Sequence, residues 1–143
     1  MTTPSPADIR ARETKLKGFL KRLTPEGMPT ETQVINVVRG AVRQAWMKSD
    51  VKLAYLYMHT IPDLDPKTRT KWLVCCEICK KNFKMTDVEV DHINGEHSFT
   101  KKEDFISYFN NVLMVDFSGL QILCKEDHAI KTLAERYKMT FEE

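Results

Sequence analysis

Apolar residues recur at helical spacing through the first third of the chain and then give way to short alternating runs. The segment Ser5-Pro6-Ala7-Asp8 has the order of a helix start, with a capping serine, a proline at the first helical position and an acid in the first turn. Because proline disfavours helical geometry in the residue before it, Pro25 predicts that this helix ends near Thr24.

A second helix is predicted from Thr30, because Thr30-Glu31-Thr32-Gln33 has the form of a capping box. Its apolar positions recur every three or four residues and are expected to pack in the core: Val34, Val37, Val38, Ala41, Val42 and Ala45. Arg39 and Arg43 lie four residues apart on another face. Two interpretations of these arginines stay open, contacts to DNA and ordinary solvated surface.

The turn-rich segment 61–66 is taken as a boundary between an N-terminal helical arm (residues 1–70) and a second domain (residues 71–143). Within that domain, residues 88–91 alternate like a half-buried strand and are followed by the turn pair Asn94-Gly95. Residues 120–124 read as a second strand.

Two helices complete this domain. Thr100-Lys101-Lys102-Glu103 is a further capping box, which predicts a short helix with these inward-facing residues: Phe105, Ile106, Phe109 and Leu113. A closing helix is expected from Asp127 to about Lys138. The pattern therefore indicates the α+β class, with the order strand, long loop, strand, helix after the arm.

Charge is unevenly distributed, although the whole chain carries only +2. Residues 1–48 have a net charge of +5 and residues 75–143 a net charge of −4. A basic half could bind phosphates while an acidic half holds a cation, but solvated helix surfaces explain the charges equally well. No apolar run approaches the roughly 20 residues that span a bilayer, and the N-terminus lacks the order of a signal peptide. We therefore expect no membrane contact and a place in the cytoplasm.

The four cysteines favour a metal site over disulfides, because no export signal is present. Cys76-Glu77-Ile78-Cys79 has the gap that lets two sulfurs reach one tetrahedral metal, whereas a redox CxxC expects a βαβ context that is missing here. Cys124 is a third ligand candidate, and Asp127 is either the fourth or the cap of the closing helix. Cys75 is then a spare thiol or a replacement ligand.

A second group of candidate functional residues consists of Asp91, His92 and His128. A carboxylate and an imidazole can hold one divalent cation, and a neighbouring imidazole can take a proton from water near neutral pH. One histidine alone is more often an ordinary polar residue. Here a strand-end Asp-His, a downstream Cys-x-x-x-His and an upstream CxxC coincide, which favours a functional site.

These motifs, in this order, resemble the HNH endonuclease family. The matching segments are Cys76-x-x-Cys79, Val90-Asp91-His92-Ile93 and Leu120-Gln121-x-Leu123-Cys124-x-x-Asp127-His128-x-x-Lys131-Thr132. The resemblance covers about residues 72–138, half of the chain, and implies a ββα-metal finger with a structural zinc knuckle. The stretch from Phe105 to Glu135, together with Arg39-x-x-x-Arg43-x-x-Trp46, is similar to small free-standing HNH nucleases of bacteriophages.

The resemblance implies that His92 is the general base and that Asp91 and His128 bind the catalytic cation, Mg²⁺ or Mn²⁺. It also implies that the cysteines, with Asp127, hold structural Zn²⁺. Arg39, Arg43 and Lys131 are the candidate DNA contacts.

Two positions depart from the family pattern. Gly119 stands where the family has the asparagine that orients the loop of the general base, and Asp127 stands at the fourth zinc cysteine. Asn94, Asn110 and Asn111 are the alternatives to that asparagine.

The expected function is metal-dependent cleavage of DNA, nicking one strand or cutting both. The alternatives are a catalytically weakened, zinc-bearing DNA-binding module and a protein–protein adaptor built on the zinc knuckle. Besides DNA, the expected partners are a second copy of the chain or the nucleic-acid machinery of a phage and its host. The cytoplasm would be the host's if the protein is phage-encoded.

Overall fold

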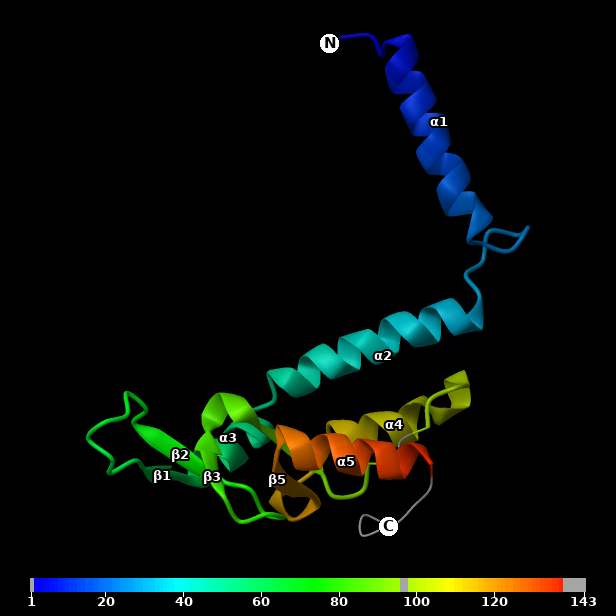
Figure 1. Cartoon of the computed structure of the whole chain (residues 1–143). Coiled ribbons are helices and arrows are strands. Elements are labelled where there is room, and N and C mark those ends of the chain that lie inside the picture. The colour runs from blue at the N-terminus through cyan, green and yellow to red at the C-terminus, as the bar shows by residue number, and fades with distance from the viewer. Residues whose placement is uncertain (1, 96–97, 138–143) are drawn as a thin grey trace.

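The computed structural model describes residues 2–95 and 98–137 as a mixture of helices and small antiparallel sheets (Figure 1). The helices are α1 (Pro6–Lys21), α2 (Glu31–Met47), α3 (Asp50–Met58), α4 (Phe105–Val112) and α5 (Lys125–Arg136). The strands are β1 (Thr60–Pro62), β2 (Trp72–Cys75), β3 (Asn82–Lys84), β4 (Val88–His92) and β5 (Leu120–Cys124). Short 3-10 turns are η1 (Met85–Asp87), η2 (Lys102–Asp104) and η3 (Phe117–Gly119). The predicted α+β class is confirmed.

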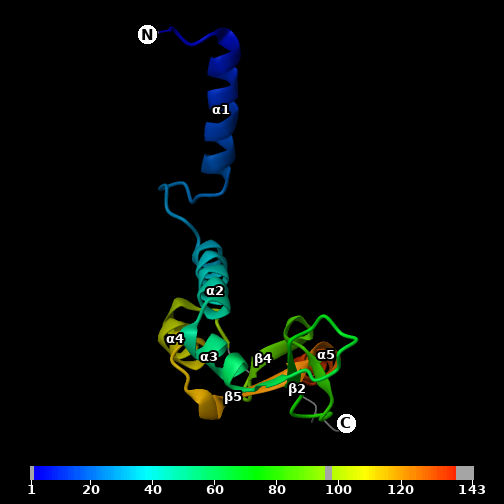
Figure 2. The ribbon, with the colours of Figure 1, turned by 90° about the vertical axis from the view of Figure 1, so that its left-hand side faces the viewer.

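Helix α1 begins as predicted and ends earlier than predicted. Ser5 and Asp8 cap each other's backbone amides, which satisfies two donors at the helix start. The helix ends at Lys21 and not near Thr24, because the chain turns back through a bridge between Leu23 and Pro29. Helix α1 buries no residue, and it extends away from the rest of the molecule in both views (Figures 1 and 2).

Helix α2 has the predicted capping box between Thr30 and Gln33, and the predicted apolar stripe is correct in part. Val38 and Val42 lie in the packed face as predicted, but Val34, Val37, Ala41 and Ala45 are exposed, and the packed face also contains Ile35, Arg39 and Trp46. The apolar side of this helix is wider than the part that is packed, so spacing alone did not select the buried positions.

Arg39 belongs to the packed face of α2. Its guanidinium donates a hydrogen bond to the Phe99 carbonyl and lies 5.8 Å from the centroid of the Phe99 ring. Arg43 is exposed, so the two arginines do not share an environment. Truncating Arg39 would therefore disturb packing, contrary to the sequence-based expectation.

Helix α4 is also rotated relative to its prediction. Its buried residues are Tyr108 and Val112, whereas Phe105, Ile106 and Phe109 are exposed. The predicted Leu113 is half-buried against the same cluster. The carboxylate that accepts from the amides of Thr100 and Lys101 belongs to Asp104 and not to Glu103, so the helix begins later than the motif suggested.

Helix α3 and the sheet β1-β2-β3 were not predicted from the sequence. Tyr55 of α3 packs in one core with residues of both sheets: Val74, Val88, Val90, Leu120 and Ile122. The turn-rich segment 61–66 lies in the hairpin of this sheet, where β1 pairs antiparallel with β2. Packing therefore crosses residues 70 and 71, and α2 and α3 lie against the second half of the chain (Figure 2).

Strands β4 and β5 were both predicted from the sequence, and they pair with each other antiparallel. Their register places Asp91 opposite Gln121 and His92 opposite Leu120. Ile122 and Leu123 are fully buried, and α5 follows β5 without a loop and packs on both strands. The predicted end of this helix at Lys138 lies outside the described residues; the helix that is described ends at Arg136. Among the described helices, none has the length and apolarity needed to cross a bilayer.

Candidate functional site

The loop that carries Cys76 and Cys79 is a tight turn between β2 and β3. The Cys76 amide donates to the Lys81 carbonyl at 2.9 Å, and the Lys80 amide donates to the Cys76 carbonyl at 2.9 Å. Lys80 closes this turn with a φ of 63°, a left-handed conformation that glycine adopts more easily than lysine. This geometry turns both sulfurs to the same side.

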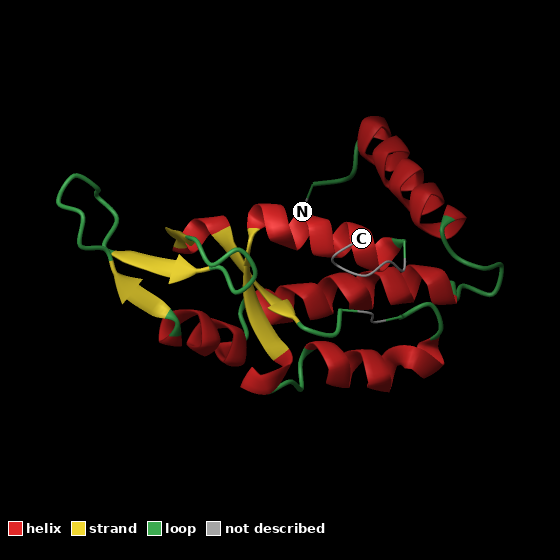
Figure 3. Ribbon diagram, turned by 60° about the horizontal axis from the view of Figure 1, so that its bottom comes forward, coloured by secondary structure: helices red, strands yellow, loops and turns green. Residues whose placement is uncertain are grey.

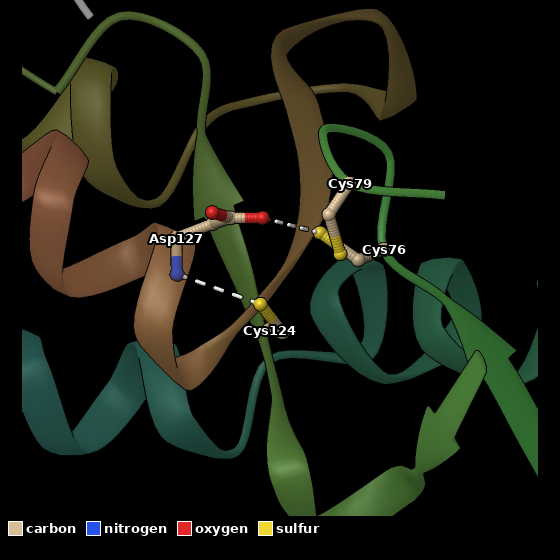
Figure 4. A group of neighbouring side chains, drawn as sticks. All are labelled: Cys76, Cys79, Cys124 and Asp127. Atoms are coloured by element: carbon tan, nitrogen blue, oxygen red, sulfur yellow. Dashed lines mark hydrogen bonds between the residues drawn. The ribbon is translucent and has the colours of Figure 1, made fainter. Parts of the chain in front are cut away.

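The other two members of the cluster lie at the start of α5. Cys124 is the N-cap of this helix, because its sulfur accepts a hydrogen bond from the Asp127 amide at 3.5 Å. Asp127 is therefore three positions inside the helix and is not its cap, which removes one of the two interpretations of this residue. Its carboxylate is directed toward the cysteine loop instead (Figure 4).

Cys76, Cys79, Cys124 and Asp127 converge, and we refer to them as the cysteine–aspartate cluster. Each offers one ligand atom, and these atoms all lie within 4.8 Å of one another (Figure 4). Ligand atoms around a tetrahedral zinc are about 3.3–3.8 Å apart, so a small contraction would complete the site. Cys75 is outside this group.

The chemistry of this cluster also fits a metal. Burial raises the pKa of Cys124 to about 11, because a thiolate in an apolar place without a cation is unfavourable. The Cys76 thiol donates to Asp127 at 3.2 Å and lowers the pKa of that carboxyl. A divalent metal would replace these thiol protons and neutralise the sulfurs, so the cluster can hold a metal ion and is compatible with zinc.

Asp91 and His128 come together on the opposite side of α5. The Asp91 Oδ1 atom lies 3.5 Å from His128 Nε2, a separation that a shared cation can bridge. Gln121 donates to the other oxygen, Oδ2, at 3.3 Å. Since 37% of the His128 side chain but only 15% of the Asp91 side chain is exposed, solvent reaches the pair from the histidine side.

Lys131 is bound tightly beside Asp91. Its ammonium lies 2.5 Å from Asp91 Oδ2, 2.7 Å from Glu135 Oε1 and 2.7 Å from the His92 carbonyl oxygen, and its side chain is 13% exposed. Burial lowers the pKa of Lys131, but the hydrogen bonds to Asp91 and Glu135 outweigh burial and raise it above its ordinary value. If Lys131 contacted DNA, as predicted, its ammonium would have to break its contacts with the oxygens of Asp91, Glu135 and the His92 carbonyl.

Two of the contacts that hold His92 were not predicted from the sequence. Its Nε2 atom is 2.9 Å from the Val112 carbonyl, and its ring packs at a tilt against Trp46 with 4.3 Å between the ring centroids. When Nε2 donates to that carbonyl, the lone pair lies on Nδ1, the tautomer that can accept a proton there. The only sequence signal for either contact was the place of Trp46 three residues after Arg43.

Gly119, which stands at the position of the asparagine in the HNH pattern, lies directly before β5. Gly119 accepts a hydrogen bond from the Ile93 amide at 2.9 Å, and a side chain added at Gly119 would meet nothing within 4 Å. Asn111 donates to Ser107 at 3.4 Å. The Val112 carbonyl and the Trp46 ring are among the groups that contact His92.

No protein-family model, no curated protein and no solved structure matches this chain.

Proposed function

We propose that this protein is a metal-dependent DNA endonuclease of the HNH type, built on a ββα-metal finger formed by β4, β5 and α5. The observation that carries the proposal is the distance of 3.5 Å between His128 Nε2 and Asp91 Oδ1. Asp91 lies at the end of β4, directly before His92, which is the last residue of that strand. A carboxylate, an imidazole ligand and a separate imidazole base are the groups that metal-assisted phosphodiester hydrolysis needs.

Asp91 Oδ1 and His128 Nε2 would hold the cation, Mg²⁺ or Mn²⁺, next to the scissile phosphate. When bound, the cation supplies positive charge that stabilises the pentacovalent transition state and the departing 3′ oxygen. His92 takes a proton from the attacking water through Nδ1, since the Val112 carbonyl orients Nε2. The family resemblance implies products with 5′-phosphate and 3′-hydroxyl ends.

Lys131 would act as a positioning residue in this arrangement. By occupying Oδ2 of Asp91, its ammonium leaves Oδ1 directed at His128. Its contact with the His92 carbonyl holds the strand end against α5. The carboxylate would therefore bind a cation through one oxygen.

The test is cleavage of supercoiled plasmid by the purified chain with Mg²⁺ or Mn²⁺. The His92→Ala variant should be slower by about 10²- to 10⁴-fold, which is the usual contribution of a general base. His59→Ala is the matched control, because His59 also stacks on an aromatic ring and has a ring nitrogen at hydrogen-bond distance from a backbone carbonyl, but far along the chain from Asp91.

Thermal unfolding and DNA binding should change little in His92→Ala relative to the loss of cleavage. Full activity in His92→Ala would disprove the mechanism.

A second candidate function, DNA binding without cutting, is favoured by two observations. The internal ammonium of Lys131 already neutralises Asp91, and Gly119 replaces the family asparagine. In that case no cation would stimulate cleavage, and His92→Ala would be indistinguishable from the unmodified chain.

A further inference from the structure

A group of exposed cations covers the sheet β1-β2-β3 and its loops. Its members are Lys67, Arg69, Lys71, Lys80, Lys81 and Lys84. None of them forms an ion pair within the described residues. Glu77 is the only acidic residue between positions 66 and 84, and its carboxylate points inward, where it accepts from the Tyr55 hydroxyl and the Ile122 amide. We call this region the basic sheet.

An aromatic side chain lies among these cations. Trp72 is 50% exposed and lines an open hollow of about 250 Å³ whose rim includes Lys71 and Lys84. An indole with lysines beside it presents a flat apolar face and positive charge to the same ligand. Proteins that bind single-stranded nucleic acids stack bases on such faces, and on a duplex the same face can pack against a deoxyribose. Folding alone does not explain an exposed tryptophan here, because its neighbour Val74 is the residue of β2 that fills the core.

The basic sheet is coupled to the candidate active site. The loop between β2 and β3 carries Cys76 and Cys79, whose sulfurs meet Cys124 and Asp127 at the start of α5. The sheet lies at the end of the molecule opposite to α1 (Figures 1 and 3). Between them, residues 88–137 contain nine acidic and five basic residues, so the central part attracts a polyanion poorly.

We propose that the basic sheet is a binding surface for the backbone of duplex DNA, with Trp72 packing against a deoxyribose beside the contacted phosphates. The inference rests on the proposed function, because it supplies phosphate contacts on the side of Asp91 away from α1. DNA is favoured over other polyanions because the sheet is joined through the cysteine–aspartate cluster to the residues that would cut DNA.

The experiment is binding of the full chain to a fluorescent DNA duplex, with divalent cations withheld, over a series of salt concentrations. Lys71→Ala combined with Lys84→Ala should weaken binding on the order of tenfold and flatten the slope of log affinity against log salt by about 0.9 for each phosphate that is no longer neutralised. The matched control is Lys48→Ala combined with Lys125→Ala, two exposed lysines outside the sheet, which should leave the slope unchanged.

Tryptophan fluorescence gives a second readout. The chain has two tryptophans, so a change on addition of the duplex should disappear in Trp72→Phe and persist in Trp46→Phe. An unchanged slope in the Lys71/Lys84 variant, with circular dichroism showing a folded chain, would overturn the proposal. If the Lys71/Lys84 variant lost binding to phosphatidylserine vesicles but kept its binding to DNA, the proposal would be overturned in favour of a lipid surface.

These readouts separate the inference from the proposed function. If the unmodified chain cuts plasmid and the Lys71/Lys84 variant has an unchanged salt slope, only the proposed role of the basic sheet is refuted. A chain that never cuts, but whose salt slope flattens in the Lys71/Lys84 variant, supports the basic sheet and refutes only the nuclease.

Discussion

Helix α5 contributes to two groups of candidate metal ligands that differ in how their charges are balanced. The cysteine–aspartate cluster combines three thiols and one carboxylate, and no basic side chain is among the partners described for it. The Asp91–His128 pair has an internal cation, the ammonium of Lys131, which contacts Asp91 and Glu135. Thiolates in the first group would therefore need a bound metal to balance their charge, whereas the carboxylate of the second group is already paired with an ammonium.

This difference indicates two kinds of site. A structural zinc site contributes its binding free energy to folding, and its ligands are closed around the ion. A catalytic cation must exchange and must leave room for substrate, so a prearranged pair with an accessible imidazole suits it better.

The largest expected effect is on stability when the first group is deprived of its metal. We expect one zinc ion per purified chain, because structural zinc contributes on the order of 10 kcal/mol in small zinc-dependent domains. A strong chelator, or Cys79→Ser, should lower the melting temperature markedly. Metal analysis and circular dichroism measure both.

Cys75→Ser is the control for this prediction, since Cys75 neighbours the cluster without belonging to it. Equal melting temperatures for Cys79→Ser and Cys75→Ser, with no zinc in the unmodified chain, would show that the cluster is an ordinary part of the core.

A smaller effect is expected when the internal cation of the second group is removed. Lys131→Met leaves two carboxylates, Asp91 and Glu135, facing each other, which should destabilise the metal-free chain by about 2 kcal/mol, between the values of exposed and buried pairs. Added Mn²⁺ should then raise the melting temperature of the variant more than that of the unmodified chain.

Lys131→Met combined with Glu135→Gln is the matched variant, because it removes the second carboxylate as well. It should regain part of the stability and show a smaller response to Mn²⁺. Identical responses to Mn²⁺ in all three proteins would separate Lys131 from the cation site.

The smallest expected effect concerns the turn of the cysteine loop. A left-handed conformation costs an L-residue about 1–2 kcal/mol, and glycine at Lys80 would remove this strain while adding freedom to the unfolded chain. The balance predicts that Lys80→Gly raises stability by up to about 1 kcal/mol. Lys81→Gly, where φ is not positive, should lower it, and chemical denaturation of the two variants compares them.

Local signals in the sequence predicted the parts of the fold that depend on neighbouring residues. The caps at Ser5 and Thr30 depend on contacts three residues away, and β5 was recognised from its own apolar run. The three cysteines of the cysteine–aspartate cluster were predicted for the same reason, whereas spacing left Asp127 open between metal ligand and helix cap.

Long-range packing decided the rest. The buried face of α2 was set by the fit of Ile35 and Trp46 against α4 and His92, which no spacing within α2 contains. The contact of Lys131 with Asp91 joins residues 40 positions apart, and it brings to the candidate site a lysine that was predicted from the sequence to contact DNA. Whether Asp91, His92 and His128 cut DNA stays a prediction.

Asp127 and His128 are consecutive residues of α5, one in the cysteine–aspartate cluster and the other beside Asp91. Side chains of consecutive helical residues diverge by about 100°, so the two groups are directed to different sides of one rigid rod. Any rotation of α5 about its axis would turn both by the same angle. A substitution that changes the geometry around the sulfurs and rotates α5 would therefore also move the His128 imidazole, and no chain of side-chain contacts between the two groups is needed.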